Sequence, residues 1–205
     1  MIKFPFSKNT ENLISDALFD RKILSFPTET FYGLGGNALS KKVVDRIYKI
    51  KGRSRKKPFI ILVNLDWINK ICFWSDSRIN ALMENFWPGP LTLVLKARKE
   101  IPRYLHDVNG SIAIRYTSSP IVQRIIELGN CPLIGTSANL SGMPECFSVR
   151  EVKQQLNNQV DMIIDGGELS QNQPSTIVNC QSKKFEVLRQ GVISLSDLNR
   201  ICEVF

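Results

Sequence analysis

Histidine is almost absent from this chain of 205 residues, since His106 is the single example. A metal site built on several histidines is therefore excluded, and the chemistry has to use Lys, Arg, hydroxyl, amide and carboxylate groups. The five cysteines are odd in number, widely spaced and contain no Cys-x-x-Cys pair. This usage argues against a disulfide framework or a zinc site and favours a reducing compartment.

Long apolar runs are also missing. The longest, residues 59–63, is far too short to span a bilayer. Residues 1–6 contain neither a long apolar region nor a small-residue cleavage pattern, so no signal peptide is expected. The Walker A pattern does not occur, which argues against a P-loop nucleotidase. The sequence therefore predicts a cytoplasmic protein with no membrane association and no dedicated metal site.

Positive charge is what the chain has in excess. It carries 27 Lys and Arg against 19 Asp and Glu, a net charge of +8, which points to anionic partners unless it is only a solvated surface. Six of the nine residues 49–57 are basic. Gly52 lets the chain turn there, so that Lys51 and Arg53 can reach one polyphosphate. Both are expected to be exposed, because they leave a helix for a loop; a solvated or nucleic-acid-facing loop is the alternative.

Helical and extended patterns alternate along the chain. Helices are predicted over residues 12–19, 40–50, 66–72, 76–86, 119–128, 148–156 and from 196 onward, with Ser40 as an N-cap. Strands are predicted over residues 23–26, 59–63, 91–95, 111–115, 132–135, 162–164, 176–178 and 185–188. The pattern predicts an α/β (α+β) fold, a twisted mixed sheet flanked by helices, in one domain of residues 1–205. The polar stretch at residues 106–110 is expected to be a surface loop.

The densest polar segment is residues 136–142, Thr-Ser-Ala-Asn-Leu-Ser-Gly, which directly follows a predicted buried strand. Hydroxyl and amide groups at a strand end can bind phosphate or carboxylate oxygens without adding charge. Side chains two apart point the same way, so Ser137 and Asn139 are expected to face a site while Ala138 packs inward. A turn that caps a helix is the competing interpretation.

Three other segments are less distinctive. Residues 33–38 formally match a relaxed dinucleotide fingerprint, but residues 27–32 separate the glycines from the preceding strand, so a tight turn after Tyr32 is expected instead. Alternation in the strand at 111–115 places Ser111, Ala113 and Arg115 on one face. Ser175 begins another strand, and Arg189 follows the last.

Together these segments resemble the YrdC-like threonylcarbamoyl-AMP synthase family over nearly the whole chain. The motifs that carry the resemblance are PTETFYGLG at 27–35, KGR at 51–53, WPGPLT at 87–92, AIR at 113–115, TSANLSG at 136–142, PSTIV at 174–178 and LRQG at 188–191. The resemblance implies a single YrdC-like domain around a positively charged cleft. The chain ends at Phe205 and so resembles the short, single-domain bacterial type.

The implied reaction joins L-threonine, bicarbonate and ATP into threonylcarbamoyl-adenylate and releases pyrophosphate. Mg²⁺ is expected to bridge the phosphates. A downstream threonylcarbamoyl-transferase complex would then modify adenosine 37 of tRNAs that read ANN codons, and the resemblance also allows weak tRNA binding by this chain.

The resemblance assigns roles to residues at matching positions. The implied catalytic set is Lys51, Arg53, Ser137 and Asn139. The implied ATP contacts are Arg55, Ser111, Ser137 and Arg189. The implied threonine contacts are Thr28, Tyr32, Arg115, Thr136 and Ser175. Two positions depart from the family pattern: Asn64 stands where many relatives have a histidine, and Glu145 stands where longer members have a small hydroxyl.

Two alternatives stay open. One is a non-catalytic RNA-binding module that uses the basic run on phosphates and stacks bases on Trp67, Trp74 or Trp87. The other is a paralogue of the same fold with another carbamoyl or acyl acceptor.

Overall fold

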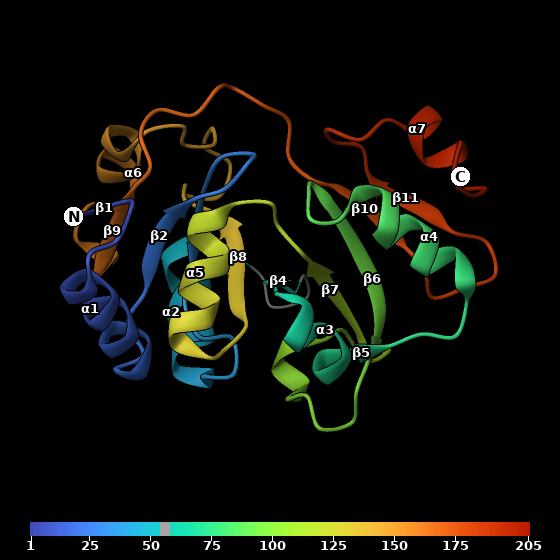
Figure 1. Cartoon of the computed structure of the whole chain (residues 1–205), viewed down its shortest axis with the longest axis horizontal. Helices are drawn as coiled ribbons and strands as arrows, with labels where there is room; N and C mark the ends of the chain where they lie inside the picture. The colour runs from blue at the N-terminus through green and yellow to red at the C-terminus, as the bar shows by residue number, and fades with distance from the viewer. Residues whose placement is uncertain (54–57) are drawn as a thin grey trace.

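A computed structural model of the chain describes residues 1–53 and 58–205. Ten strands form one continuous path through a sheet, and this sheet confirms the predicted α/β class with a mixed sheet flanked by helices (Figure 1). Their spatial order is β1 (Ile2–Lys3), β9 (Met162–Asp165), β2 (Leu24–Pro27), β3 (Tyr32–Gly35), β8 (Leu133–Ser137), β4 (Ile60–Leu62), β7 (Ser111–Arg115), β6 (Leu91–Ala97), β10 (Thr176–Asn179) and β11 (Glu186–Arg189). A further short strand, β5 (Cys72–Phe73), pairs with β6.

The helices lie close to where the apolar spacing predicts them. They are α1 (Lys8–Phe19), α2 (Lys41–Lys51), α3 (Leu65–Ile71), α4 (Ser77–Phe86), α5 (Pro120–Gly129), α6 (Val149–Leu156) and α7 (Leu195–Asn199), with 3₁₀ turns at 103–105 and 157–159. Within the described ranges, no helix has the length and apolar character needed to cross a bilayer.

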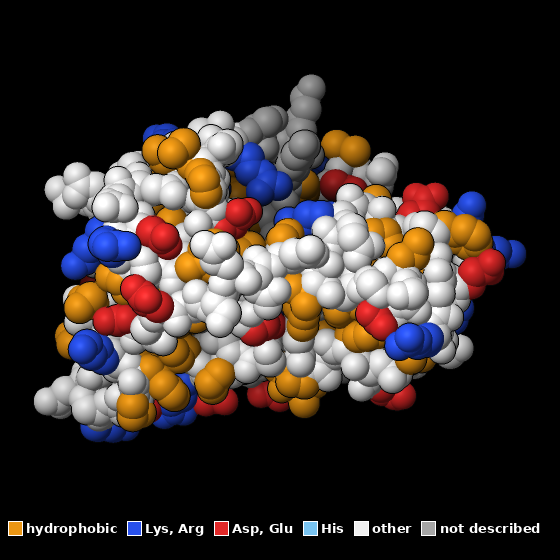
Figure 2. Space-filling model, turned by 90° about the horizontal axis from the view of Figure 1, so that it is seen from above, with side chains coloured by type: hydrophobic (Ala, Val, Ile, Leu, Met, Phe, Trp, Pro, Cys, Tyr) orange, Lys and Arg blue, Asp and Glu red, His pale blue; other side chains and the backbone are white. Residues whose placement is uncertain are grey.

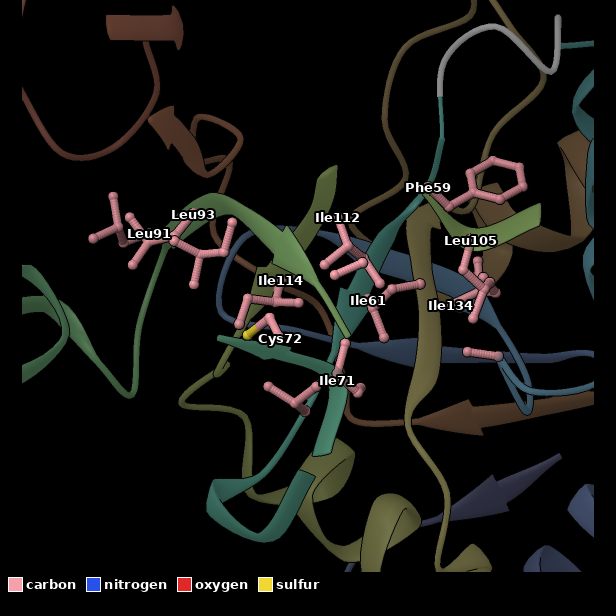
Figure 3. Close-up of a cluster of buried hydrophobic side chains, with 14 of the residues drawn as sticks. Phe59, Ile61, Ile71, Cys72, Leu91, Leu93, Leu105, Ile112, Ile114 and Ile134 are labelled. Atoms are coloured by element: carbon pink, nitrogen blue, oxygen red, sulfur yellow. The ribbon is translucent and has the colours of Figure 1, made fainter. Parts of the chain in front are cut away.

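The central pairing joins β8 to β4 in antiparallel register, with Ile61 opposite Ile134. Alternate residues of these strands pack into two separate cores. Leu62 and Leu133 belong to the core that contains α1 and α5. Ile61 and Ile134 belong to the larger core, where Figure 3 shows side chains of β4 and β7 meeting Ile71 at the end of α3. Apolar side chains therefore pack on both faces of β4 and β8, which fixes the position of the sheet relative to the helices.

One prediction about the glycines is wrong. Gly33 and Gly35 do not form a turn after Tyr32; they lie inside β3, between β2 and β8. A Cβ atom at Gly35 would come within 2.0 Å of the Ile134 carbonyl oxygen and 2.9 Å of the Phe26 ring. The glycines are required here because neighbouring atoms occupy the space of a side chain.

Ser40 and Ser148 both occupy N-cap positions, but of these two only Ser148 makes capping hydrogen bonds. Ser148 caps α6 in a reciprocal capping box: its hydroxyl accepts from the Glu151 N–H, and the Glu151 carboxylate accepts from the Ser148 N–H. Ser40 occupies the predicted N-cap position of α2, but its side chain makes no capping hydrogen bond.

Ser148→Ala is therefore expected to lower the free energy of unfolding by about 1 kcal/mol, because it leaves α6 with an unpaired N–H group. Ser40→Ala is the matched control and should change the stability much less. Urea unfolding of both variants measures the difference, and equal losses would contradict the assigned caps.

Candidate active site

A cleft of about 610 Å³ opens over the central strands of the sheet. Figure 2 shows a hollow on this face with Lys and Arg side chains beside it. Residues from β3, β4, β6, β7, β8, β10 and β11 line the cleft, so segments far apart in the sequence converge there. Eight residues predicted for the site are among the lining: Thr28, Arg53, Ser111, Arg115, Thr136, Ser137, Ser175 and Arg189.

Strand β7 shows how the sheet directs side chains into the cleft. Ile112 and Ile114 are fully buried in the core, whereas Ser111, Ala113 and Arg115 line the cleft, as the alternation predicts. The cleft wall and the core are thus opposite faces of the same strand.

Lys51 does not reach the cleft surface, and the expectation that it is exposed is wrong. It is the last residue of α2, and its side chain points back toward the end of β8. Only 5% of the residue is exposed. Its Nζ lies 2.7 Å from the Ser137 carbonyl oxygen, 3.3 Å from Ser137 Oγ, 2.6 Å from the Asn139 carbonyl oxygen and 2.5 Å from Asn139 Oδ1. The helix continues to Lys51 and turns only at Gly52, whose φ of 58° is left-handed, so Lys51 stays on the inner side.

Ser137, Asn139 and Lys51 form one polar network. Ser137 Oγ donates to Asn139 Oδ1 at 2.6 Å and itself lines the cleft. Asn139 is 5% exposed, and its amide nitrogen donates to the Met143 carbonyl group. Ala138 between them is fully buried, as predicted. The pair therefore does not cap a helix. Ser137 faces the cleft as predicted, whereas Asn139 is not among the described lining residues and lies behind Ser137, where it accepts from Lys51.

The charge of Lys51 is retained at neutral pH. Burial, followed by repulsion from Arg53, lowers the pKa of Lys51 to about 8. The oxygens of Ser137 and Asn139 face the ammonium group, which can donate three hydrogen bonds. The network therefore places a buried positive charge directly behind a cleft hydroxyl.

Arg115 is held by two groups outside the cleft. Its Nε donates to the Gly89 carbonyl oxygen at 3.2 Å, and its Nη2 forms an ion pair with Glu29 Oε1 at 2.8 Å. Glu29 Oε1 also accepts from the backbone N–H of Ser118, and Oε2 accepts from the Thr117 hydroxyl. Burial alone would raise the pKa of Glu29, but Arg115 and Thr117 outweigh it, and the pKa lies below its usual value.

Ser175 and Arg189 meet on the opposite side of the cleft. Nε and Nη2 of Arg189 donate to the Ser175 carbonyl oxygen at 3.0 and 2.9 Å, and Nη2 also donates to Ser175 Oγ at 2.9 Å. The Ser175 hydroxyl is paired with Thr92 Oγ1 as well. Thr28 uses its hydroxyl in a local turn, where it donates to the Phe31 carbonyl oxygen at 2.7 Å. These groups are pre-positioned, which limits the entropy lost when a ligand binds.

The remaining predicted residues are placed differently. Tyr32 is fully buried; its hydroxyl donates to the Gly167 carbonyl oxygen and accepts from the Gly166 N–H. Arg55 lies outside the described residues. Asn64 caps α3 through Trp67 N and is not among the described cleft-lining residues.

Sequence reasoning missed two acidic groups, one in the cleft and one beside it. Asp107 lines the cleft, although its polar segment was expected to be a surface loop. Glu29 was overlooked even though it stands inside the motif PTETFYGLG, where an acidic residue close to a basic cleft is a usable signal. The described residues that line the cleft include five charged side chains: Arg53, Arg115, Arg189, Asp107 and Glu145. Their net charge is +1.

Comparison with known proteins identifies the family. A family model named Sua5/YciO/YrdC and described as "Telomere recombination" matches residues 16–191. The chain belongs to the Sua5/YciO/YrdC family. Every residue predicted for the site lies within the matched range.

Curated relatives of this Sua5/YciO/YrdC chain carry a functional name. The threonylcarbamoyl-AMP synthase of Pyrococcus abyssi is 34% identical over 181 residues, which are 88% of this chain and 53% of that protein. The chain thus spans about half the length of this relative. The putative threonylcarbamoyl-AMP synthase of Methanocaldococcus jannaschii is 34% identical over 194 residues, 94% of this chain and 91% of that protein.

Solved structures of the same family superpose on the chain. The crystal structure of P. abyssi Sua5 complexed with L-threonine has a TM-score of 0.92 at 30% identity and covers all of this chain, with 61% of its own length matched. E. coli YciO has a TM-score of 0.82 at 28% identity, covering 96% of this chain and 97% of its own.

Lys51→Ala is expected to lower the free energy of unfolding by roughly 1–3 kcal/mol, because it removes the ammonium group that donates to the carbonyl oxygens of Ser137 and Asn139. Arg53→Ala is the matched control. Arg53 is half-exposed and lies 5.2 Å from the centre of the Phe59 ring, a contact worth about 1 kcal/mol or less. Urea unfolding tests this order, and an equal or larger loss in Arg53→Ala would contradict it.

Because of the Glu29–Arg115 pair, we expect part of the free energy of unfolding to be lost at acidic pH. The pKa of Glu29 is lower in the folded protein than in the unfolded chain, so its contribution is complete above the unfolded value of 4.5 and is lost as the pH falls through the folded value. Glu29→Gln should remove this contribution. Its stability should therefore fall less than that of the unmodified protein between pH 6.5 and pH 3.5. Urea unfolding at both pH values measures this. If the free energy of unfolding falls equally in Glu29→Gln and in the unmodified protein, the assignment is refuted.

Proposed function

We propose that this chain is a threonylcarbamoyl-AMP synthase, a nucleotidyltransferase that forms threonylcarbamoyl-adenylate and pyrophosphate from L-threonine, bicarbonate and ATP. The observation that carries the proposal is the convergence of cations and neutral hydroxyl groups at one cleft: Arg53, Arg189, Ser137 and, behind it, the buried Lys51. The similarity to proteins named threonylcarbamoyl-AMP synthases supports it.

The groups around the cleft suit different parts of the substrates, and the two sets meet where Arg189 donates to Ser175. Arg115, Thr28, Thr136 and Ser175 offer a guanidinium and three hydroxyl groups, which match the carboxylate and hydroxyl of threonine. Because Glu29 neutralises much of the Arg115 charge, this set suits a single carboxylate better than a polyphosphate. The similarity to a Sua5 structure complexed with L-threonine supports threonine as a substrate.

Arg53, Arg189 and Ser137 then face the phosphates, and Lys51 adds positive potential from behind Ser137. The threonine amine condenses with bicarbonate, which releases water and gives a carbamate; a carbamate oxygen then attacks the α-phosphorus of ATP, and the bond from that phosphorus to pyrophosphate breaks. This step moves negative charge and needs no strong protein base. Positioning and fixed positive charge are its main requirements, and the described cleft lining, which contains no histidine, offers these.

Mg²⁺ would be held mainly by the phosphates of ATP, because Mg²⁺ in such sites uses few protein carboxylates. Among the described residues, no group of three or more His, Cys, Asp or Glu side chains could hold a metal ion. Glu145 is exposed at the cleft and is the carboxylate positioned to assist there. When bound, the ion would neutralise phosphate charge.

The wider setting follows from the same proposal. Residues 1–205 would form one domain, since strands from both ends of the chain share one sheet. The protein would work in the cytoplasm and pass its product to a threonylcarbamoyl-transferase complex acting on adenosine 37 of tRNA. Direct RNA stacking finds less support: Trp87 and Trp74 are half-buried and donate to Leu91 and Asn80.

Formation of a carbamoyl-adenylate is expected only when ATP, bicarbonate and threonine are present together. Mass spectrometry of reactions with each amino acid in turn tests this. A product with threonine alone supports the proposal, and a different preferred amino acid indicates a paralogue with another acceptor. Absence of any adenylate, together with salt-sensitive tRNA binding, would favour the RNA-binding alternative.

A further inference from the structure

Asp107 lies at the end of the cleft opposite Arg115. Strand β7 presents Ser111, Ala113 and Arg115 to the cleft, and its last position is four residues along the chain from its first. At about 3.3 Å per residue, these positions are roughly 13 Å apart along the strand. Asp107 is bonded to Ser111 and lines the cleft beside it, so a ligand that reaches Arg115 at one end needs considerable length to reach Asp107.

The two carboxylate oxygens of Asp107 are used unequally. Oδ1 accepts from the N–H of Asn109 at 2.9 Å, the N–H of Ser111 at 2.8 Å and Ser111 Oγ at 3.0 Å. Within residues 1–53 and 58–205, Oδ2 has one donor nearby, the same Ser111 hydroxyl at 3.0 Å, whose single hydrogen is shared between both oxygens. Oδ1 therefore anchors the loop, and Oδ2 keeps acceptor capacity for a ligand.

The surroundings define what this acceptor can bind. Val94, Ala113, Ile177 and Leu188 line the cleft, and Val94 stands directly opposite Ala113 on the neighbouring strand. This apolar wall suits the faces of a base and a sugar. A carboxylate repels phosphate groups, so the phosphates belong near Arg53 and Arg189, whereas an acceptor without a hydrogen of its own requires a donor such as a hydroxyl group.

We propose that Asp107 Oδ2 accepts a hydrogen bond from a ribose hydroxyl group of the nucleotide, which places the nucleoside at the Asp107 end of the cleft. The inference rests on the proposed function, because it takes ATP as the ligand. It deepens that function by assigning a nucleotide-recognition residue. Acidic side chains recognise ribose hydroxyl groups in the same way in dinucleotide-binding folds.

The experiment measures binding of ATP, 2′-deoxy-ATP and 3′-deoxy-ATP to the full chain by calorimetry. Loss of a hydrogen bond to a charged acceptor should weaken binding of one deoxy analogue by about 10- to 100-fold. Asp107→Asn keeps an oxygen for the loop N–H groups and replaces the other with an amide donor. This variant should bind ATP as weakly as the unmodified protein binds the disfavoured analogue, and should no longer distinguish the two.

Two further variants separate the alternatives. Ser111→Ala keeps the Asp107 carboxylate and should retain the discrimination, whereas its loss there would assign the hydroxyl contact to Ser111 and overturn the proposal. Glu145→Gln removes another carboxylate from the same cleft and should also retain it, which controls for a general effect of charge.

The outcomes are distinguishable from failure of the proposed function. If the unmodified protein binds none of the three nucleotides, the proposed function fails and this inference fails with it. If it binds all three within twofold of one another, or if a folded Asp107→Asn still discriminates, the inference alone is overturned. If Asp107→Asn does not fold, Ser111→Ala still decides between the two residues. Retained discrimination in Ser111→Ala favours Asp107, and lost discrimination favours Ser111.

Discussion

A buried ammonium group is the constraint on which the site depends. An uncompensated charge inside a protein is strongly unfavourable, so Lys51 requires oxygen acceptors wherever its side chain ends. The carbonyl and side-chain oxygens of Ser137 and Asn139 provide them, which fixes the end of α2 to the end of β8. The same contacts orient the Ser137 hydroxyl toward the cleft, so one interaction serves both folding and the site.

Arg115 follows the same principle at the other end of the cleft. Its guanidinium is almost fully buried and is stabilised by Glu29 and by the Gly89 carbonyl group. Removing one partner of such a pair is unfavourable because the other charge stays buried. The carboxylate of Glu29 is therefore present beside the cleft for a structural reason, and the number of basic residues in the sequence overstates the positive charge there.

Much of the fold was predictable because it depends on local periodicity. The alternation in β7 and the apolar spacing in α2 and α5 gave the correct elements, and the family resemblance gave the residues around the cleft. The glycines of β3 were misassigned because tertiary contacts, not a turn, require glycine there: Ile134 and Phe26 leave no space for a side chain. Burial of Lys51 was missed for a similar reason, since its acceptors are 86 and 88 residues away in sequence. Asp107 has no sequence signal, because only the folded sheet brings its loop to the cleft.

The order of the strands has a consequence for the way the protein is made. The cleft combines Thr28 from early in the chain with Ser175 and Arg189 from near its end, and β10 pairs with β6 in parallel register across about 85 intervening residues. On the ribosome, the central strands can pair before β10 and β11 exist, but the cleft then lacks one wall. The larger core is also incomplete at that stage, because Val178 and Phe185 belong to it, so only the core that contains α1 and α5 can form in full before the C-terminal strands are made.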